Sequence, residues 1–218
     1  MWIIFGDKGS GAFAAEAALA EAGADYQFRQ VSLKGDEQRK PEFLAINPSG
    51  KIPALQLPEG GILTETLAML LTVAERYPAA ALLPPAGTFA RAQAFRWLAF
   101  MASEIYPMVE IEDYPARFAP EGAESEALRE KARDRIRARL LIVEHAIAGP
   151  WLLAEGFSAA DICAAMFIRW SAAHGWRDTH APKLCAIMRN VAERPRLAPV
   201  WPRYFPALTG SHASTGSA

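Results

Sequence analysis

The sequence predicts two domains, an N-terminal α/β domain over residues 1–77 and an all-helical domain over residues 88–208. Before residue 78, apolar runs short enough for strands alternate with helical patterns in the order β-α-β-α-β-β-α. Residues 78–87 are rich in proline and glycine, which is typical of a linker. No convincing strand pattern follows them. Residues 209–218 contain only Gly, Ser, Ala, His and Thr, which predicts a disordered tail.

Composition and charge narrow the possible functions. The chain has 218 residues, of which 51% are hydrophobic, as expected for a globular protein with well-buried cores. Its formal net charge of −1 gives no field to attract nucleic acid or an anionic membrane, so neither is expected as a partner. The first residues lack a basic leader and no apolar run approaches about 18 residues, so we expect a cytoplasmic protein.

The cysteines and histidines give no sign of a metal or redox site. Cys163 and Cys185 lie in apolar helical patterns without CxxC spacing, so buried reduced thiols are expected. The histidines show no metal-ligand spacing with carboxylates. We therefore expect no bound metal.

The first three elements follow from apolar spacing and from the positions of glycine. Trp2–Phe5 is a short apolar run and is expected to form the first strand. A glycine-rich loop leads to Ser10, where an alanine-rich helix begins, and Gly23 is suited to end that helix after Ala22. Residues 26–33 begin with alternating apolar and polar side chains, which predicts a half-buried second strand.

The rest of the α/β domain is expected to contain a helical turn, a hairpin and a helix. Pro41–Ile46 suits a single helical turn. The turn residues Pro58–Gly61 separate two short apolar runs and predict an antiparallel hairpin. Thr64–Thr66 then open an apolar helix that runs to about Tyr77. With a right-handed parallel crossover at its start, this order resembles a thioredoxin-like domain.

One loop of this domain has the features of a peptide-binding site. Proline cannot donate to a sheet ladder, so Pro53 belongs at a strand start, where a cis bond after Ile52 can be built in. Such a bond would turn the main-chain N–H and C=O groups of Ile52 toward an extended, peptide-like ligand. The helix that begins near Thr66 adds unpaired N–H groups, which attract a carboxylate. The alternative is an ordinary junction between a hairpin and a helix.

The same stretch carries a family resemblance. Asn47–Leu55 reads Asn-Pro-x-Gly-Lys-Ile-Pro-x-Leu, and Glu65-Thr66 follows the hairpin turn. This pattern resembles the glutathione-site signature of cytosolic glutathione transferases, whose usual pair is Glu-Ser. The resemblance continues along nearly the whole chain and implies a thioredoxin-like glutathione-binding domain, a helical second domain and a homodimer. It also implies glutathione as cosubstrate, a small hydrophobic electrophile, a role in detoxification and no metal.

The resemblance implies a catalytic role for Ser10, because family members place a hydroxyl or thiol at the start of the first helix. The pKa of a free thiol is about 8.5 and must fall by about 2 units for the thiol to be ionised at pH 7, which needs about 2.7 kcal/mol. A hydrogen bond to a charged group supplies about 1.5–3 kcal/mol and a helix N-terminus about 0.5–1 kcal/mol, so the two together suffice. The alternative is that Ser10 only caps its helix.

Further residues are expected to hold glutathione beside the main chain of Ile52–Pro53. Lys34 and Lys51 flank the loop and could pair with the glycyl carboxylate. Glu65 would meet the γ-glutamyl ammonium group, and Thr66 would hold the adjacent carboxylate. Exposed loop lysines are common, and a glutamate at the start of a helix also complements the helix dipole, so structural roles are the alternative.

Bacterial beta-type members give the nearest resemblance, and the chain departs from them at two points. They usually carry Cys at the position of Ser10, and His and Lys where this chain has Tyr106-Pro107. The absence of a thiol argues against mixed-disulfide chemistry and for attack of the glutathione thiolate on an electrophile. Tyr106 could donate a hydrogen bond to sulfur or substrate, with a buried core tyrosine as the alternative.

The electrophile is expected to lie between the two domains. The candidate residues for its pocket are Gly11, Phe13, Tyr106, Met108, Tyr114 and Trp170. Aromatic residues at helical spacing are more often core residues, and nothing in the sequence identifies the substrate. Two other functions stay open, a non-catalytic glutathione-fold protein that binds ligands or partners, and a glutathione-dependent isomerase or dehalogenase.

The helical domain shows three clear segments. Residues 88–116 predict an aromatic-rich helix that Pro107 should kink or end. Glu124–Ala148 is a second helix whose arginines are offset by acids three residues earlier, as on a solvated face. Ser158 and Asp161 have the spacing of a capping box before an apolar helix, with a role in folding and not in chemistry.

Overall fold

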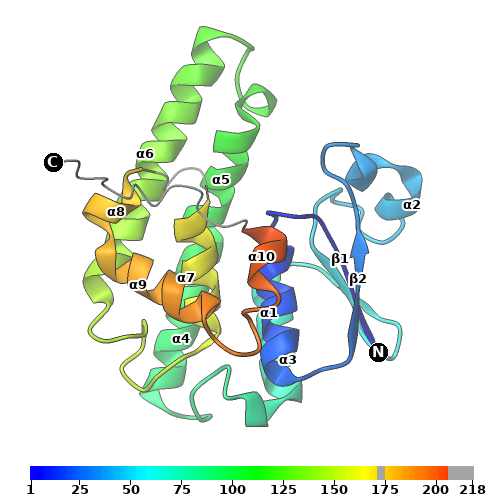
Figure 1. The fold of residues 1–218 in the computed structure, drawn as a ribbon. Helices are drawn as coiled ribbons and strands as arrows, with labels where there is room; N and C mark the ends of the chain where they lie inside the picture. The colour runs from blue at the N-terminus through cyan, green and yellow to red at the C-terminus, as the bar shows by residue number, and fades with distance from the viewer. Residues whose placement is uncertain (171–174, 206–218) are drawn as a thin grey trace, which may run out of the picture.

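The computed structural model describes residues 1–170 and 175–205 and contains a four-stranded mixed sheet followed by a helical domain (Figure 1). This is the predicted architecture, with a thioredoxin-like N-terminal domain and an all-helical C-terminal domain. The strands are β1 (Trp2–Gly6), β2 (Tyr26–Gln30), β3 (Ala54–Gln56) and β4 (Ile62–Leu63). The predicted tail, residues 209–218, lies outside the described residues.

The sheet has the strand order β2-β1-β3-β4. β1 pairs parallel with β2 and antiparallel with β3, and β3 pairs antiparallel with β4, as the predicted crossover and hairpin require. β2 ends at Gln30, earlier than predicted. The Val31 N–H still donates to the Gly6 carbonyl of β1 at 2.7 Å, but the two N–H groups after it have side-chain acceptors, since Ser32 donates to Glu37 at 2.7 Å and Leu33 donates to Asp7 at 2.8 Å.

Two helices cover one face of the sheet and a short helix lies on the other side (Figure 1). The helices of this domain are α1 (Ala12–Ala22), α2 (Pro41–Leu44) and α3 (Thr66–Arg76), with 3₁₀ turns at Glu37–Arg39 and Pro78–Ala80. α1 and α3 lie between the sheet and the helical domain, whereas α2 lies on the far side. Gly23 ends α1 in the left-handed conformation, with a φ of 64°.

The helical domain begins with a helix that is interrupted before its proline. Its elements are α4 (Phe89–Phe100), a π-helical turn (Met101–Ile105), α5 (Tyr106–Asp113), a 3₁₀ turn (Pro115–Arg117), α6 (Ala123–Ala146), α7 (Ala159–Arg169), α8 (Arg177–His180), α9 (Pro182–Ala192) and α10 (Trp201–Tyr204). The predicted break at Pro107 is present, because proline has no N–H to continue the α-helical ladder. The wider π turn takes up the interruption.

The main apolar core runs through both domains. Trp2 and Phe13 of the first domain and Met101 and Ile136 of the second are almost completely buried in one continuous cluster. A smaller cluster lies apart from it and consists of Phe5, Val31, Phe43 and Ala54. The two domains therefore share a core, which fixes the position of any site between them.

The predicted capping box starts α7. Ser158 Oγ accepts a hydrogen bond from the Ala160 N–H at 3.3 Å, and Asp161 Oδ2 accepts one from the Ser158 N–H at 2.8 Å. Asp161 Oδ1 also accepts one from the Leu152 N–H at 2.7 Å, so this fully buried carboxylate ties an upstream loop to the helix.

The surface of α6 carries the predicted pairs of acids and arginines. These pairs are Glu126–Arg129, Glu130–Arg133 and Asp134–Arg137. Arg133 also reaches Glu112 of α5, which is almost fully buried, at 3.0 Å. Within residues 1–170 and 175–205, no helix has the length and apolar character needed to cross a bilayer.

Candidate functional site

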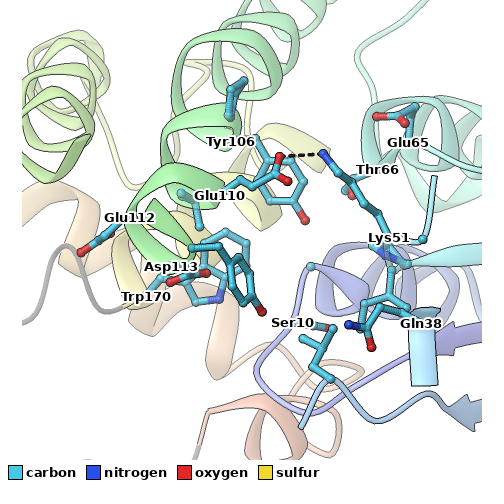
Figure 2. Close-up of a pocket in the computed structure, with 18 of the residues that line it drawn as sticks. Ser10, Gln38, Lys51, Glu65, Thr66, Tyr106, Glu110, Glu112, Asp113 and Trp170 are labelled. Atoms are coloured by element: carbon cyan, nitrogen blue, oxygen red, sulfur yellow. Dashed lines mark hydrogen bonds and ion pairs between the residues drawn. The ribbon is translucent and has the colours of Figure 1, made fainter. Parts of the chain in front are cut away.

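A cavity of about 560 Å³ lies between the two domains (Figure 2). Such a volume suits a small ligand. The first domain contributes the loop before α1, the loop that leads to β3 and the start of α3, and the second domain contributes α5, the turn after it and Trp170. Figure 2 shows Ser10, Lys51 and Thr66 across the cavity from Tyr106 and Glu110.

Ser10 lies just before α1 and lines the cavity, but its hydroxyl already has hydrogen-bond partners. Ser10 Oγ donates to the Asp7 carbonyl at 2.7 Å and accepts from the N–H groups of Ala12, at 3.2 Å, and Asp7, at 3.3 Å. The bond from Ala12 satisfies the first N–H of α1, and the two bonds to Asp7 hold the loop before the helix, so the helix-start role that the sequence left open as the alternative is present. A bond to a ligand sulfur would have to replace the bond to Asp7.

Gly11 lets Tyr106 approach the start of α1. A Cβ atom at Gly11 would lie 1.8 Å from the Tyr106 hydroxyl, so a larger residue would exclude the phenol from this place. The Tyr106 ring stacks on Trp170 with ring centroids 5.7 Å apart, and the Trp170 indole N–H donates to the Gly9 carbonyl at 3.1 Å. Burial raises the pKa of Tyr106 to about 12, so the phenol is a neutral hydrogen-bond donor at pH 7.

The loop before β3 presents main-chain groups to the cavity. The Ile52–Pro53 peptide bond is cis. The sheet ladder begins at Ala54, so Ile52 lies in the cavity lining and outside the paired residues. Asn47 stabilises the loop, since its amide donates to the Lys51 carbonyl at 2.6 Å and its side-chain oxygen accepts from the Ser49 N–H at 3.1 Å.

The start of α3 supplies a hydroxyl close to that of Tyr106. Thr66 is the first residue of the helix, and its buried Oγ1 atom makes no hydrogen bond of good geometry within the described part of the chain, although it is near enough to the Tyr106 phenol to lower the pKa of that phenol against the larger effect of burial. Glu65, just before it, has a φ of 66°, which is uncommon for a residue other than glycine and is often found at functional sites. Both residues line the cavity, as the sequence predicted for a ligand site.

Lys51 reaches across the cavity to the other domain. Its Nζ atom lies 2.6 Å from Oε2 of Glu110 on α5 (Figure 2). The other oxygen of Glu110 lies 3.5 Å from Arg117. The sequence suggested that Lys51 would face a ligand carboxylate. In the structure a carboxylate of the protein itself holds that position.

Gln38 is a lining residue that the sequence did not indicate. Its side chain is almost fully buried, its amide N–H donates to Asp36 at 3.1 Å, and its Oε1 atom has no partner among the described residues. The residue lies in a segment that showed only a loop pattern. A glutamine in a loop carries no local signal that distinguishes a buried ligand contact from an exposed side chain.

Three predicted site residues do not line the cavity. Phe13 is fully buried and its ring packs edge-on against Trp201 and Tyr204, because it projects from α1 into the core. Met108 packs against the core, while the next residue on α5 faces the cavity. Lys34 is exposed, and its neighbour Leu33 provides the lining.

The α5 side of the cavity is more polar than an apolar substrate pocket. Tyr106 and Trp170 provide aromatic surface, but Glu110, Glu112 and Asp113 also line the space. Burial and the neighbouring Glu112 raise the pKa of Asp113. In the described ranges, no three His, Cys, Asp or Glu side chains are close enough to hold a metal ion.

Comparisons with known proteins identify relatives of both domains. The model of the glutathione S-transferase N-terminal domain matches residues 12–76, and that of the C-terminal domain matches residues 94–195. The GST-like protein YncG of Escherichia coli K12 is 30% identical over 201 residues, which is 92% of this chain and 97% of that protein.

Two solved structures have the same fold over nearly the whole chain. A glutathione transferase homologue from Sulfitobacter with bound glutathione is 32% identical, with a TM-score of 0.85 over 92% of this chain and 96% of that one. The beta-class glutathione S-transferase of Sphingomonas chungbukensis is 30% identical, with a TM-score of 0.75 over 90% of this chain and 96% of that one.

Proposed function

Because the chain belongs to the glutathione S-transferase family, with beta-class structures among its relatives, we propose that it binds glutathione in the cavity between its domains and activates the thiol for attack on an electrophile. The relative from Sulfitobacter contains bound glutathione, which supports glutathione as the ligand of this cavity. Which residues contact glutathione is proposed separately below.

One observation carries this proposal, namely that two buried polar atoms of the cavity lining make no hydrogen bond of good geometry with any described residue. These are Oε1 of Gln38 and Oγ1 of Thr66. Leaving such an atom unpaired costs about 1–3 kcal/mol, so a ligand that pairs with it gains the same amount. A bound tripeptide supplies an N–H group for Gln38 and a carboxylate oxygen for Thr66.

The remaining groups of glutathione have partners in the same lining. The main chain of Ile52 pairs with the peptide backbone as an added strand would. Glu65 faces the γ-glutamyl ammonium group, and the N–H groups at the start of α3 assist Thr66 in holding the carboxylate beside it. Lys51 takes the glycyl carboxylate.

The sulfur lies near the start of α1 in this arrangement. Ser10 turns its hydroxyl from the Asp7 carbonyl to the thiolate, and the neutral phenol of Tyr106 gives a second hydrogen bond across Gly11. Each bond to a charged acceptor contributes about 1.5–3 kcal/mol, enough together with the helix end to ionise the thiol near pH 7. The thiolate then forms a carbon–sulfur bond, and the leaving group departs with its electron pair.

The test compares thiolate formation in variants of the two donors. Thiolate absorbance of bound glutathione is titrated against pH in the wild type, Ser10→Ala and Tyr106→Phe. Removal of the donor that acts on sulfur should raise the apparent pKa of the glutathione thiol by about 1–2 units. Unchanged titration in both variants would leave the N–H groups of α1 as the only stabilising element and would refute both assignments.

Glutathione binding itself is tested by calorimetry with Thr66→Val and Thr66→Ser. Valine keeps the shape but removes the hydroxyl, so glutathione affinity should fall about tenfold while serine retains it, in line with about 1.4 kcal/mol for one hydrogen bond. No heat with reduced glutathione at millimolar levels, in a well-folded wild-type sample, would refute the proposed function.

A non-catalytic ligand-binding protein is the second candidate, and the bond from Ser10 to Asp7 favours it. With its proton held there, the hydroxyl acts as a helix cap and gives nothing to sulfur. Turnover with a panel of electrophiles decides between the two. Measurable glutathione affinity with no turnover would favour the second candidate, while an isomerase or dehalogenase would act only on its own substrate class.

We also propose a homodimer in the cytoplasm with a role in detoxification, on the strength of the family. The exposed apolar side chains of Phe89 and Phe95 on α4 support an interface. Cys163 and Cys185 are buried free thiols, which suits a reducing compartment. Light scattering at several protein concentrations gives the mass of the particle and tests the dimer.

A further inference from the structure

Glu110 forms ion pairs with two cations that line the cavity, Lys51 of the first domain and Arg117 of the second. Its side chain is 28% exposed, whereas those of Lys51 and Arg117 are 61% and 36% exposed. One carboxylate oxygen lies 2.6 Å from Lys51 of the first domain (Figure 2). The other lies 3.5 Å from Arg117 of the second domain. All three residues line the cavity.

We propose that Glu110 is a built-in competitor for the ligand carboxylate and lowers the affinity of the cavity for glutathione. The inference rests on the proposed function, in which Lys51 takes the glycyl carboxylate. Glu110 presents to Lys51 the same chemical group at hydrogen-bond distance. Two carboxylates beside one ammonium group repel each other, so the ligand carboxylate displaces Glu110 from Lys51.

The geometry gives Glu110 a second partner after displacement. Arg117 already lies at its other oxygen, and the Arg117 guanidinium is fixed 3.8 Å from the centre of the Tyr114 ring. Glu110 can therefore leave Lys51 and remain paired with Arg117. An ion pair as exposed as Lys51–Glu110 costs little to break, because water solvates both charges.

Opening this ion pair does not require the domains to separate. Trp170 still donates to the Gly9 carbonyl beside the cavity. On α1, the Glu21 carboxylate accepts two hydrogen bonds from Arg194, both of 2.8 Å. The Lys51–Glu110 pair therefore sets the charge of the ligand site and is not needed to hold the cavity together.

Calorimetry of Glu110→Gln with reduced glutathione tests the proposal. The variant frees Lys51, so the Kd should be about two- to fivefold lower than that of the wild type, the range of an exposed ion pair. With glutathione esterified at its glycyl carboxylate, the two proteins should bind equally well. In a Lys51→Met background, Glu110→Gln should have no effect.

A second variant should change the glutathione affinity in the opposite direction, and it gives a test even if Glu110→Gln does not fold. Arg117→Gln removes the partner that receives Glu110, so glutathione should bind more weakly than to the wild type. Glu104→Gln is the matched control for Glu110→Gln, because Glu104 pairs with Arg139 away from the cavity and both changes remove one negative charge.

The outcomes separate this inference from the proposed function. A wild type that binds glutathione, together with an unchanged or higher Kd in Glu110→Gln, overturns the competition and leaves the proposed function standing. Lower Kd values for both the free acid and the ester also overturn it, because the effect would then not involve the glycyl carboxylate. A wild type that binds no glutathione overturns both.

Discussion

Gly11 shows how a single missing side chain shapes the site. Its φ and ψ of −62° and −7° suit any residue, so the backbone does not require glycine here. What excludes a larger residue is the Tyr106 hydroxyl, 1.8 Å from the place of a Cβ atom. The sequence placed both residues in the substrate pocket, but their mutual contact depends on how the two domains pack.

We therefore expect Gly11→Ala to displace the phenol. Gly11 is the N-cap of α1, where alanine is no better than glycine, and the clash costs about 1–3 kcal/mol, so the melting temperature should fall. Tyr106→Phe in the same chain removes the clashing oxygen and should restore stability without restoring the thiol pKa. Thermal unfolding and thiolate titration of the single and double variants measure both effects. Equal melting temperatures for Gly11→Ala and its double variant would contradict the contact.

The phenol of Tyr106 should also leave a signature in the pH dependence of stability. Because burial raises its pKa from 10.0 to about 12, the folded chain holds this proton more tightly than the unfolded chain does. The resulting stability is complete below pH 10 and is lost as the pH rises from about 10 to about 12. The free energy of unfolding of the wild type minus that of Tyr106→Phe should be constant between about pH 6 and about pH 9 and should fall above about pH 10. A difference that stays constant up to about pH 12 would show that the phenol is not buried.

At the scale of single residues, the sequence identified those cavity-lining residues that belong to a contiguous motif. The loop with Lys51, Ile52 and Pro53 and the start of α3 at Thr66 all line the cavity, because short-range turn and cap chemistry sets their positions. Gln38 was missed and Phe13 was misplaced. In both cases burial decides the role, and burial depends on packing between segments distant in sequence.

At the scale of elements, Pro107 determines where the second half of the site begins. The sequence predicted the interruption from the missing N–H of proline. It gave no sign that the preceding turn, Met101–Ile105, would be π-helical. The π turn leads directly into α5, where Tyr106, Met108 and Val109 all pack against the core but only Tyr106 and Val109 also line the cavity.

The capping box of α7 predicts a large loss of stability in Asp161→Ala. The substitution leaves the buried N–H groups of Leu152 and Ser158 without acceptors, and each unpaired group costs about 1–3 kcal/mol. Unfolding in urea should report a loss of about 2–5 kcal/mol, while the Kd for glutathione of the folded fraction stays unchanged. Asp134→Ala is the control, since Asp134 is exposed and its loss should change stability by no more than about 0.5 kcal/mol. Equal effects of the two variants would show that the box does not hold the loop.

At the scale of the whole molecule, the end of the described chain returns to the first helix. Glu16 of α1 is fully buried and accepts hydrogen bonds from Tyr26 of the sheet and from Arg203 and Tyr204 of α10. No local pattern predicts a contact between residues so far apart. The sequence indicated two domains from the linker at residues 78–87, but not that one continuous core and a buried carboxylate join them.

This shared core predicts that the two domains unfold together. Glu16→Gln removes the charge that Arg203 faces but keeps the shape of the side chain, so it should cost about 1–3 kcal/mol. Tryptophan fluorescence and far-ultraviolet circular dichroism should still give coincident urea transitions, because the apolar cluster continues from Trp2 to Ile136 without Glu16. Glu75→Gln, an exposed change on α3, should leave the midpoint unchanged. If the two transitions separate in Glu16→Gln, then the buried carboxylate, and not the apolar core, couples the domains.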